Sequence, residues 1–485
     1  MKRIRLLLLC LCAMAAVSVD AVSLDSCRMM ALANNKQLKI ADVKVARARY
    51  QHKSARAAYL PAIDAEASYV YNQKELALIG EDAKLPTMSF NPTTGGYDYN
   101  VVKKPDGEPL VANGVPVPSE VALLPKSALT YDIHNVFAGA VSITQPLYMG
   151  GKIHALNKIA GYAEQMAEYE RKRIVGDVVY DVDVAYWLVV SLKAKERLAQ
   201  SYVSLLDTLN YNVKAMLTQG VATQADVLSV KVKLNEARVD LVKTQNGVSL
   251  ARMQLSQLCG LPVDTEMTLD DEIVDVMNAD MPLISTEYDI NEVYEHRNDV
   301  NELGLVVKVN EQRVVAERAS MLPQIALVGA YSVTNPNSFN GFKNEFGGMF
   351  SVGAMVKIPL WHWGGNYNRY KVAKSDAVIS RITLYDAKEQ IALQVRQASY
   401  KMQEAMKVYH TTRVNCESAE ENLRTAQLGF KEGVLAVDAV MCAQTAWLKA
   451  NADAVDAIVD VRLASDDGKI RSLLRIDILA FINYG

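Results

Sequence analysis

The chain of 485 residues has few cysteines and no paired cysteine motif. Two of its six cysteines lie in an apolar run near the N-terminus, and the other four show no C-x-x-C spacing. This pattern excludes the common zinc and redox motifs. The six histidines are scattered, with no two at the ligand spacing of one helical turn. We therefore expect no metal site and no cofactor.

The chain also lacks an excess of either charge. Lys and Arg number 52 against 55 Asp and Glu, a formal net charge of −3. Proteins that bind nucleic acid normally carry a basic excess, so we expect no nucleic-acid partner. Charged residues make up 22% of the chain and apolar residues 50%, which excludes wholesale disorder and leaves enough apolar surface for packed cores.

Long apolar runs are missing except near the N-terminus, where residues 1–21 resemble a secretory signal peptide. A basic start precedes the apolar stretch Leu6–Val17, and small residues precede a predicted cut after Ala21. Twelve apolar residues are too few to span a bilayer. Lipid attachment at Cys27 is disfavoured, because Cys27 lies well past this stretch. No later run of about 18 apolar residues occurs, so we expect an exported chain without a transmembrane helix.

No arrangement of residues indicates catalysis. Gly150-Gly151-Lys152 resembles part of a phosphate-binding loop, but the required spacing and the Ser or Thr after the lysine are missing. The sequence shows no Ser/His/Asp arrangement and no carboxylate pair in a context that suggests a pocket. We expect no enzymatic activity.

The most informative feature is an internal duplication, shown by three recurring motifs. The pairs are Leu60–Ile63 with Leu322–Ile325, Pro146–Gly151 with Pro359–Gly365, and Gly220-Val221 with Gly433-Val434. The offset falls from 262 for the first pair to 213 for the last, so the first copy has 49 additional residues. They lie in segment 72–135, which holds seven of the fourteen prolines and is predicted to be a long irregular loop.

Each copy is predicted to contain a long helical hairpin, at about residues 150–258 and 364–474. Apolar residues recur in a 4-3 rhythm along both halves of each hairpin, which is typical of coiled-coil packing. The first helix of each hairpin runs 69 or 68 residues between glycines, about 100 Å at 1.5 Å per residue. Helices of that length must project beyond any compact core.

Four segments alternate apolar and polar residues with period two, as β-strands do. They lie at about residues 61–71, 136–147, 323–333 and 348–359. A length of about 9–12 residues suits tilted membrane-spanning strands, although a soluble β-sandwich stays open as an alternative. Aromatic residues that suit a membrane interface follow the strands, namely Tyr148, Trp361 and Trp363.

Four strands cannot close a barrel, because even eight enclose only a packed interior. An exported chain with four such strands must oligomerise to hide its edges, and a trimer would give twelve strands and an open pore. The predicted domains are repeats at 22–260 and 290–485, joined by an acidic linker at 261–289. Segment 264–289 has nine acidic residues and no Lys or Arg, so we expect this linker to be solvated.

The ordered motifs resemble the TolC-type outer membrane factors of efflux and type I secretion systems. The resemblance covers essentially the whole mature chain and rests on paired Leu-Pro strand starts, paired motifs of Pro-Leu followed after two or three intervening residues by Gly-Gly, and paired Gly-Val turns. It implies a mainly α fold with a small β part, in which a duplicated strand–strand–long helical hairpin unit forms a trimeric α-helical barrel and a 12-stranded transmembrane β-barrel. Each protomer contributes four strands. The implied location is the outer membrane of a diderm bacterium, with a periplasmic helical domain.

The resemblance also implies a passive exit duct for efflux or type I secretion. Its partners would be two further copies of the chain, a periplasmic adaptor (membrane fusion) protein, an inner-membrane pump or ABC transporter, and outer-membrane lipid. An exported structural or adhesive coiled-coil protein is the alternative, and it leaves the alternating strands unexplained. The family's adaptor-docking tips correspond to six turn residues, Gly220, Val221, Ala222, Gly433, Val434 and Leu435.

A periplasmic gate is the last feature that the resemblance implies. Some family members carry paired Asp residues six and nine positions after the second turn glycine, but those positions are Ala439 and Cys442 here. Asp226, Asp438 and Glu432 are the gate candidates of this chain. A helix-capping role for Asp226 is the alternative.

Overall fold

The structure is a computed structural model that describes residues 21–273 and 289–473. The predicted signal peptide and residues 274–288 of the predicted linker lie outside the described residues, apart from Ala21. The chain forms two compact units. Of the described residues, one unit comprises 21–55, 155–273, 289–315 and 368–473, and the other comprises Arg56–His154 and Ala316–Tyr367. Each repeat therefore contributes to both units.

The expected duplication is confirmed by the order of elements. The first repeat runs α3 (Lys36–Ala57), β1 (Ala62–Tyr71), β10 (Asn135–Tyr148), α4 (Lys152–Thr218) and α5 (Gln224–Leu258). The second runs α8 (Asn298–Ala319), β11 (Gln324–Asn335), β12 (Gly347–Lys357), α9 (Gly365–Lys431) and α10 (Val437–Leu473). Helices α3 and α8 both have 22 residues, and α4 and α9 both have 67. Equal lengths follow from the equal spacing of the motifs that start and end them.

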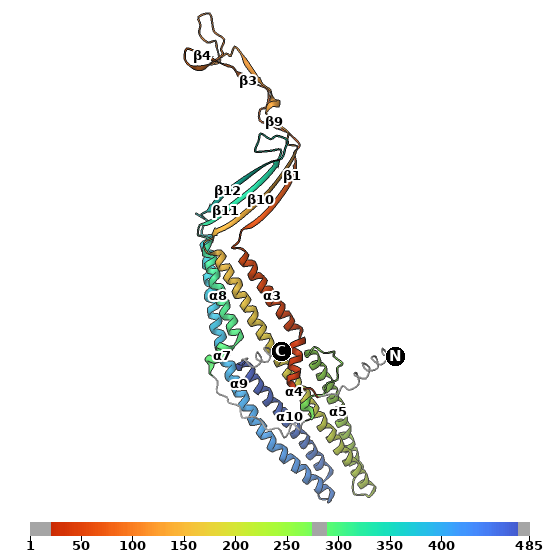
Figure 1. The fold of residues 1–485 in the computed structure, drawn as a ribbon. Coiled ribbons are helices and arrows are strands. Elements are labelled where there is room, and N and C mark those ends of the chain that lie inside the picture. The colour runs from red at the N-terminus through yellow and green to blue at the C-terminus, as the bar shows by residue number, and fades with distance from the viewer. Residues whose placement is uncertain (1–20, 274–288, 474–485) are drawn as a thin grey trace, which may run out of the picture. The chain divides into compact units, whose positions relative to one another are not determined.

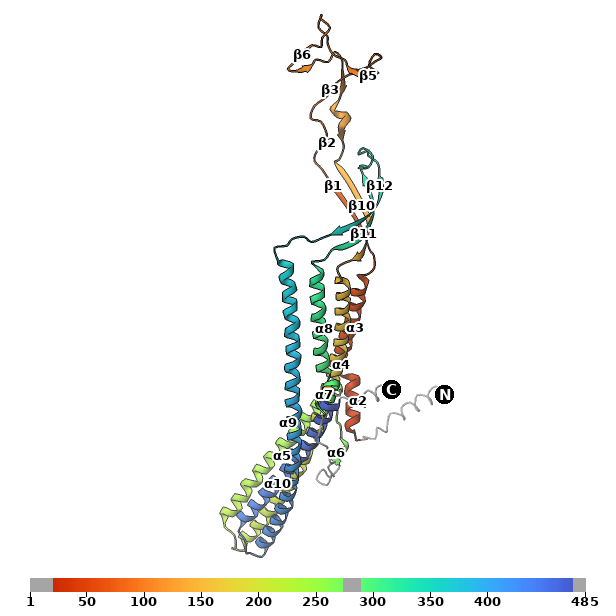
Figure 2. The ribbon, with the colours of Figure 1, turned by 90° about the vertical axis from the view of Figure 1, so that its left-hand side faces the viewer.

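The two helical hairpins, α4/α5 and α9/α10, lie side by side in both views of the ribbon (Figures 1 and 2). Their contacts follow the predicted heptad rhythm. Val182 and Val189 on α4 are fully buried, and so are Leu206 and Val213, each pair seven residues apart. Glu196 interrupts the apolar series and is buried, but Lys193 Nζ lies 2.7 Å from its carboxylate. The local ion pair explains how a charged residue is tolerated there.

Part of the predicted linker differs from expectation, because Met267, Leu269 and Glu272 are buried rather than solvated. Met267 and Leu269 are buried in an apolar cluster with residues of α4 and α5. The short helix α6 (Asp270–Ile273) follows, and its Asp271 accepts a 2.7 Å hydrogen bond from the Tyr186 hydroxyl. Arg252 donates to buried Glu272 at 2.6 Å. Composition alone predicted a solvated segment, but each of these acidic side chains has a specific polar partner.

The four long strands form one antiparallel sheet in the order β1-β10-β11-β12. All ten residues of β1 are exposed, and β12 is exposed except at its first residue. Neither face of these strands is covered by another layer of the described chain. Strands β1 and β12 each have a partner on one side only within the described residues. Such open edges and faces need a covering from outside the chain.

The expectation of an irregular loop at 72–135 is wrong, because the segment forms four short antiparallel ladders beyond the sheet (Figure 1). They are β2 (Leu76–Ala77) with β9 (Thr130–Tyr131), β3 (Ala83–Pro86) with β8 (Val121–Leu124), β4 (Met88–Asn91) with β5 (Gly96–Tyr99), and β6 (Val111–Ala112) with β7 (Val115–Pro116). Strands of two to four residues are too short to give a readable alternation. Asn113-Gly114, with φ of 53° and 80°, is a hairpin signal that could have revealed one ladder.

Across the described ranges, no helix is both long and apolar enough to cross a membrane.

Candidate docking tips, gate residues and membrane sheet

Both 67-residue helices end in the same capping motif, centred on a glycine. Gly220 and Gly433 have φ of +76° and +73°, a region that residues with a Cβ rarely adopt. Each glycine N–H donates to the carbonyl three residues earlier, at 3.0 Å. The N–H groups of Val221 and Val434 reach the carbonyls five residues earlier, at 2.9 and 2.8 Å. These paired bonds define a Schellman motif, which satisfies the last helical carbonyls and ends each helix at the glycine.

The two hairpin tips lie together, because all four hairpin helices contribute to one apolar cluster beneath them. Its buried members are Leu209, Val213, Val227, Val230, Phe430, Val437 and Val440. Ala222 packs against this cluster, and Leu435 folds over Gly429, where an added Cβ would lie 2.8 Å from Leu435 Cδ1. Val221 and Val434 are 68% and 78% exposed. The structure thus presents two repeat-related valines to solvent, while the other predicted tip residues shape the turns.

The helices that return from the two tips begin differently. Thr223 caps α5 and forms a capping box with Asp226, whose carboxylate accepts from the Thr223 N–H at 2.8 Å and hydroxyl at 2.7 Å. These bonds, the side-chain bond first, lower the pKa of the Asp226 carboxyl, so the box is complete when Asp226 is ionised. At the start of α10 the corresponding positions are Ala436, just before the helix, and Ala439 in its first turn. Of the two tips, only the first has a side-chain capping box.

The three predicted gate residues all lie near the tips. Asp226 is six residues after Gly220, Glu432 directly precedes Gly433, and Asp438 is in the first turn of α10. Glu432 and Asp438 are exposed, and Asp226 is partly exposed. The Asp226 carboxylate takes part in the capping box, as the alternative interpretation expected. Capping leaves its negative charge in place, so a structural role does not remove an electrostatic one.

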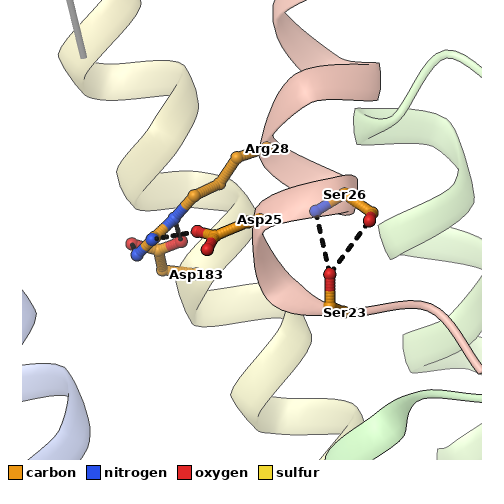
Figure 3. Close-up of polar contacts among 5 residues, drawn as sticks. All are labelled: Ser23, Asp25, Ser26, Arg28 and Asp183. Atoms are coloured by element: carbon orange, nitrogen blue, oxygen red, sulfur yellow. Dashed lines mark hydrogen bonds and ion pairs between the residues drawn. The ribbon is translucent and has the colours of Figure 1, made fainter. Parts of the chain in front are cut away.

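A buried ion pair that sequence reasoning missed anchors α2 (Leu24–Asn34) to α4. Arg28 Nε and Nη2 donate to the two carboxylate oxygens of Asp183, both at 2.7 Å, and Nη1 reaches Asp25 at 3.0 Å (Figure 3). The Asp183 side chain has no exposed surface. Ser23 caps α2 by accepting from the Ser26 N–H at 3.3 Å. The signal that could have revealed Asp183 is an acidic residue among the buried valines of the heptad series.

The strand register places most large apolar residues of the four strands on one face of the sheet, because cross-strand partners point the same way. Two rows of partners show this, Ala65–Val141–Tyr331–Phe350 and Ile63–Ile143–Gly329–Val352. The opposite face carries small and polar rows, such as Asp64–Ser142–Ala330–Ser351 and Ser68–Ala138–Thr334–Gly347. One face therefore suits lipid and the other suits water.

The predicted interface aromatics lie at or just beyond the strand ends. Tyr148 is the last residue of β10 and is half exposed. Trp361 and Trp363 follow β12 and are 73% and 90% exposed, with ring centroids 6.0 Å apart. Large aromatic rings are rarely left this open to water, so their surroundings in the assembled protein must include more than the chain itself.

Metal chemistry finds no support in the part of the chain that the structure describes, where no group of three His, Cys, Asp or Glu side chains is placed to hold an ion. The family and the solved structures to which the chain is similar are channel proteins rather than enzymes.

Comparison with known proteins agrees with this architecture. The chain is similar to the toluene efflux pump outer membrane protein TtgF of Pseudomonas putida, with 24% identity over 246 residues, half of each protein. The match thus spans about half the length of that curated relative. The fold of this chain is similar to that of the CmeC outer membrane channel of Campylobacter jejuni. The TM-score is 0.71 at 15% identity, and the match covers 96% of this chain and 89% of CmeC. The open-state MtrE outer membrane channel of Neisseria gonorrhoeae gives a TM-score of 0.63 at 16% identity, covering 93% and 88%.

These comparisons confirm the expected fold class. The family model described as "Outer membrane efflux protein" matches residues 118–261 and 290–465, which is more than half of the chain. The two matched segments contain both helical hairpins and three of the four long strands. This chain, located in the outer membrane, belongs to the outer membrane efflux protein family.

Proposed function

We propose that the chain forms the outer-membrane exit duct of a tripartite efflux system, a passive channel that runs through the outer membrane and across the periplasm. The observation that carries the proposal is the bare four-stranded sheet, open on both faces and both edges within the described residues. Its strands continue into hairpins whose first helices have 67 residues, about 100 Å of helix at 1.5 Å per residue. A sheet that lies in the outer membrane and helices that cross the periplasm account for both the bare sheet and the long hairpins.

A homotrimer is the assembly that this sheet favours. Three copies would pair β1 of one chain with β12 of the next and give twelve strands, with no free edge. Two copies would give eight strands, which enclose only packed side chains. The apolar rows would then face lipid and the polar rows would line the pore. Tyr148, Trp361 and Trp363 would lie at the membrane interface, where amphipathic rings are favoured.

The alternative of a structural or adhesive coiled-coil protein explains the helices but not the sheet. A surface fibre has no need for two strands in each repeat with matched apolar faces. The curated relative is named as an efflux pump outer membrane protein, which favours efflux over protein secretion as the process served.

The oligomeric mass of the extracted protein tests the proposal. We expect the mature chain, expressed in a diderm bacterium, to fractionate with the outer membrane. In mild detergent its mass should be about three times that of one chain, measured by light scattering with the detergent subtracted. A chain released as a monomer without detergent would contradict the duct, and the exposed sheet would then need another partner.

The adaptor is the proposed partner at the tips. Val221 and Val434 are exposed beside capped turns of fixed geometry, and a trimer would present six such valines in a ring. A periplasmic adaptor with apolar residues at its own tip would bury them, and an inner-membrane pump would supply the energy. Rigid turns with exposed apolar side chains limit the entropy lost on docking.

Asp226, Asp438 and Glu432 are proposed to form a cation-selective constriction at the same end. Replacing both aspartates, as Asp226→Ala with Asp438→Ala, is expected to lower the preference for cations over anions, because two negative charges per protomer leave the entrance. Single-channel recording in planar bilayers measures this preference.

The matched control is Thr223→Ala, which removes the cap of α5 but keeps both aspartates. It should leave ion preference unchanged. Equal effects of the two variants would show that Asp226 acts only through the capping box, and no effect of the double replacement would leave these residues as helix caps and turn residues.

A further inference from the structure

Two cysteines from distant parts of the chain meet in the core of the helical unit. Cys27 lies on α2, and Cys259 caps the C-terminus of α5, 232 residues later. Both are fully buried in the same apolar cluster. Cys259 Sγ donates to the carbonyl oxygen of Cys27 at 3.7 Å. The two cysteines are therefore neighbours in the core.

The backbone around the pair is held by contacts that do not involve the sulfurs. The Val22 N–H donates to the Thr268 carbonyl at 2.8 Å, and the Asp270 N–H returns to the Val22 carbonyl at 3.2 Å. At the other end of α2, Asn34 Nδ2 donates to the carbonyl of Cys259 at 3.5 Å. The ion pair of Arg28 with Asp183 fixes the middle of the helix (Figure 3). These contacts hold α2 in place, so Cys27 and Cys259 lie next to each other without any bond between their sulfur atoms.

We propose that Cys27 and Cys259 are joined by a disulfide bond in the exported protein, tying α2 to the end of α5. The proposal depends on export to an oxidising compartment, where disulfides form and persist, and not on transport by the duct. A bond between residues this far apart in sequence closes a loop containing the whole first repeat, which restricts the unfolded chain strongly.

The other two described cysteines are not placed to pair with each other. Cys416 Sγ donates to the carbonyl of Ala450 at 3.0 Å. Cys442 lies on the same helix as Ala450, eight residues earlier, which is roughly 12 Å along the axis. A disulfide needs sulfur atoms about 2 Å apart. Cys416 and Cys442 should therefore remain thiols and serve as an internal control.

The reaction needs an oxidant, which we assign to the class of protein disulfides carried by thiol–disulfide oxidoreductases. The Cys27 thiolate attacks the oxidant's disulfide and forms a mixed disulfide, releasing one oxidant thiolate. The Cys259 thiolate then attacks Cys27 Sγ, and the second oxidant sulfur leaves. The chain loses two protons and two electrons, and the oxidant becomes a dithiol. In the folded chain Cys27 is fully buried, out of reach of a protein oxidant, and the neighbouring Cys259 and burial also raise the pKa of its thiol. We therefore place this reaction before α2 packs.

Peptide mapping without reduction tests the proposal on the wild-type protein. Protein from the outer membrane is denatured with N-ethylmaleimide present, digested with trypsin and analysed by mass spectrometry. We expect a covalently linked pair of peptides carrying Cys27 and Cys259, lost on reduction, with maleimide only on Cys416 and Cys442. Maleimide on all four cysteines would overturn the proposal. A lipid on the Cys27 sulfur would overturn it too.

Variants separate the bond from a mere packing role of the two sulfurs. Cys27→Ser and Cys259→Ser should each make the remaining partner reactive and lower the unfolding temperature in detergent by roughly 5–10 °C. The double variant with Cys416→Ser and Cys442→Ser should keep the linked peptides and the unfolding temperature of the wild type. Treating the wild type with a reductant should reproduce the loss seen in the single variants, while an unchanged temperature after complete reduction would show that no stabilising bond had been present.

Discussion

Replacing Gly150 with alanine is expected to destabilise the protein by about 3 kcal/mol, whereas the same change at the next residue should cost only about 1 kcal/mol. Gly150 lies between β10 and α4 with φ of +64°. An added Cβ would stand 2.8 Å from the Ala319 carbonyl oxygen and 3.0 Å from Leu322 Cβ. A backbone oxygen cannot move aside cheaply, so steric overlap adds to the strain of positive φ.

Gly151 is the matched control. Its φ is +88°, so alanine is strained there too, but no atom lies within 4 Å of an added Cβ. The two variants differ in the close approach alone. Urea unfolding in detergent, and the amount of assembled protein in the outer membrane, measure the difference. Equal losses would mean that Gly150 is needed for its backbone angle and not for the contact with the end of α8.

Arg28→Met should destabilise the helical unit by about 3 kcal/mol, because it leaves the Asp183 carboxylate buried without its guanidinium. The Asp183 side chain is fully buried, and the Arg28 side chain is only 26% exposed. Both carboxylate oxygens accept from Arg28 at 2.7 Å, so methionine replaces the hydrocarbon stem but neither bond. Urea unfolding measures the loss, and faster amide exchange in α2 should accompany it.

Two further variants define what the ion pair does. Arg28→Met with Asp183→Leu should recover most of the stability, because no buried charge is then left. Arg424→Met is the matched surface control, since the Arg424–Glu421 pair is 66% and 62% exposed and exposed pairs contribute little. If Arg28→Met behaved like Arg424→Met, the anchoring of α2 would have to come from its apolar contacts.

The tips show how far local signals reach. Gly220 and Gly433 are predicted as turns because the Gly-Val pair recurs at the same offset in both copies, and both glycines adopt the positive φ that such a turn requires. The capping role of Asp226 was open as an alternative, and the structure shows it as a capping box with Thr223, three positions earlier. The exposure of Val221 beside the buried cluster was not predictable, because it depends on four helices packing together.

Local patterns in the sequence were enough to predict the duplication, the long hairpins and the four strands, because each depends on periodicity and turn residues within one segment. Features that depend on residues far apart in the chain became visible only in the folded structure. The strand register aligned four separate apolar series on one face, and folding joined Arg28 to Asp183 across 155 residues and Cys27 to Cys259 across 232. Short ladders in segment 72–135 escaped prediction because two to four residues carry too little pattern. No local rule specifies such pairings, since they are stabilised only when the whole chain packs.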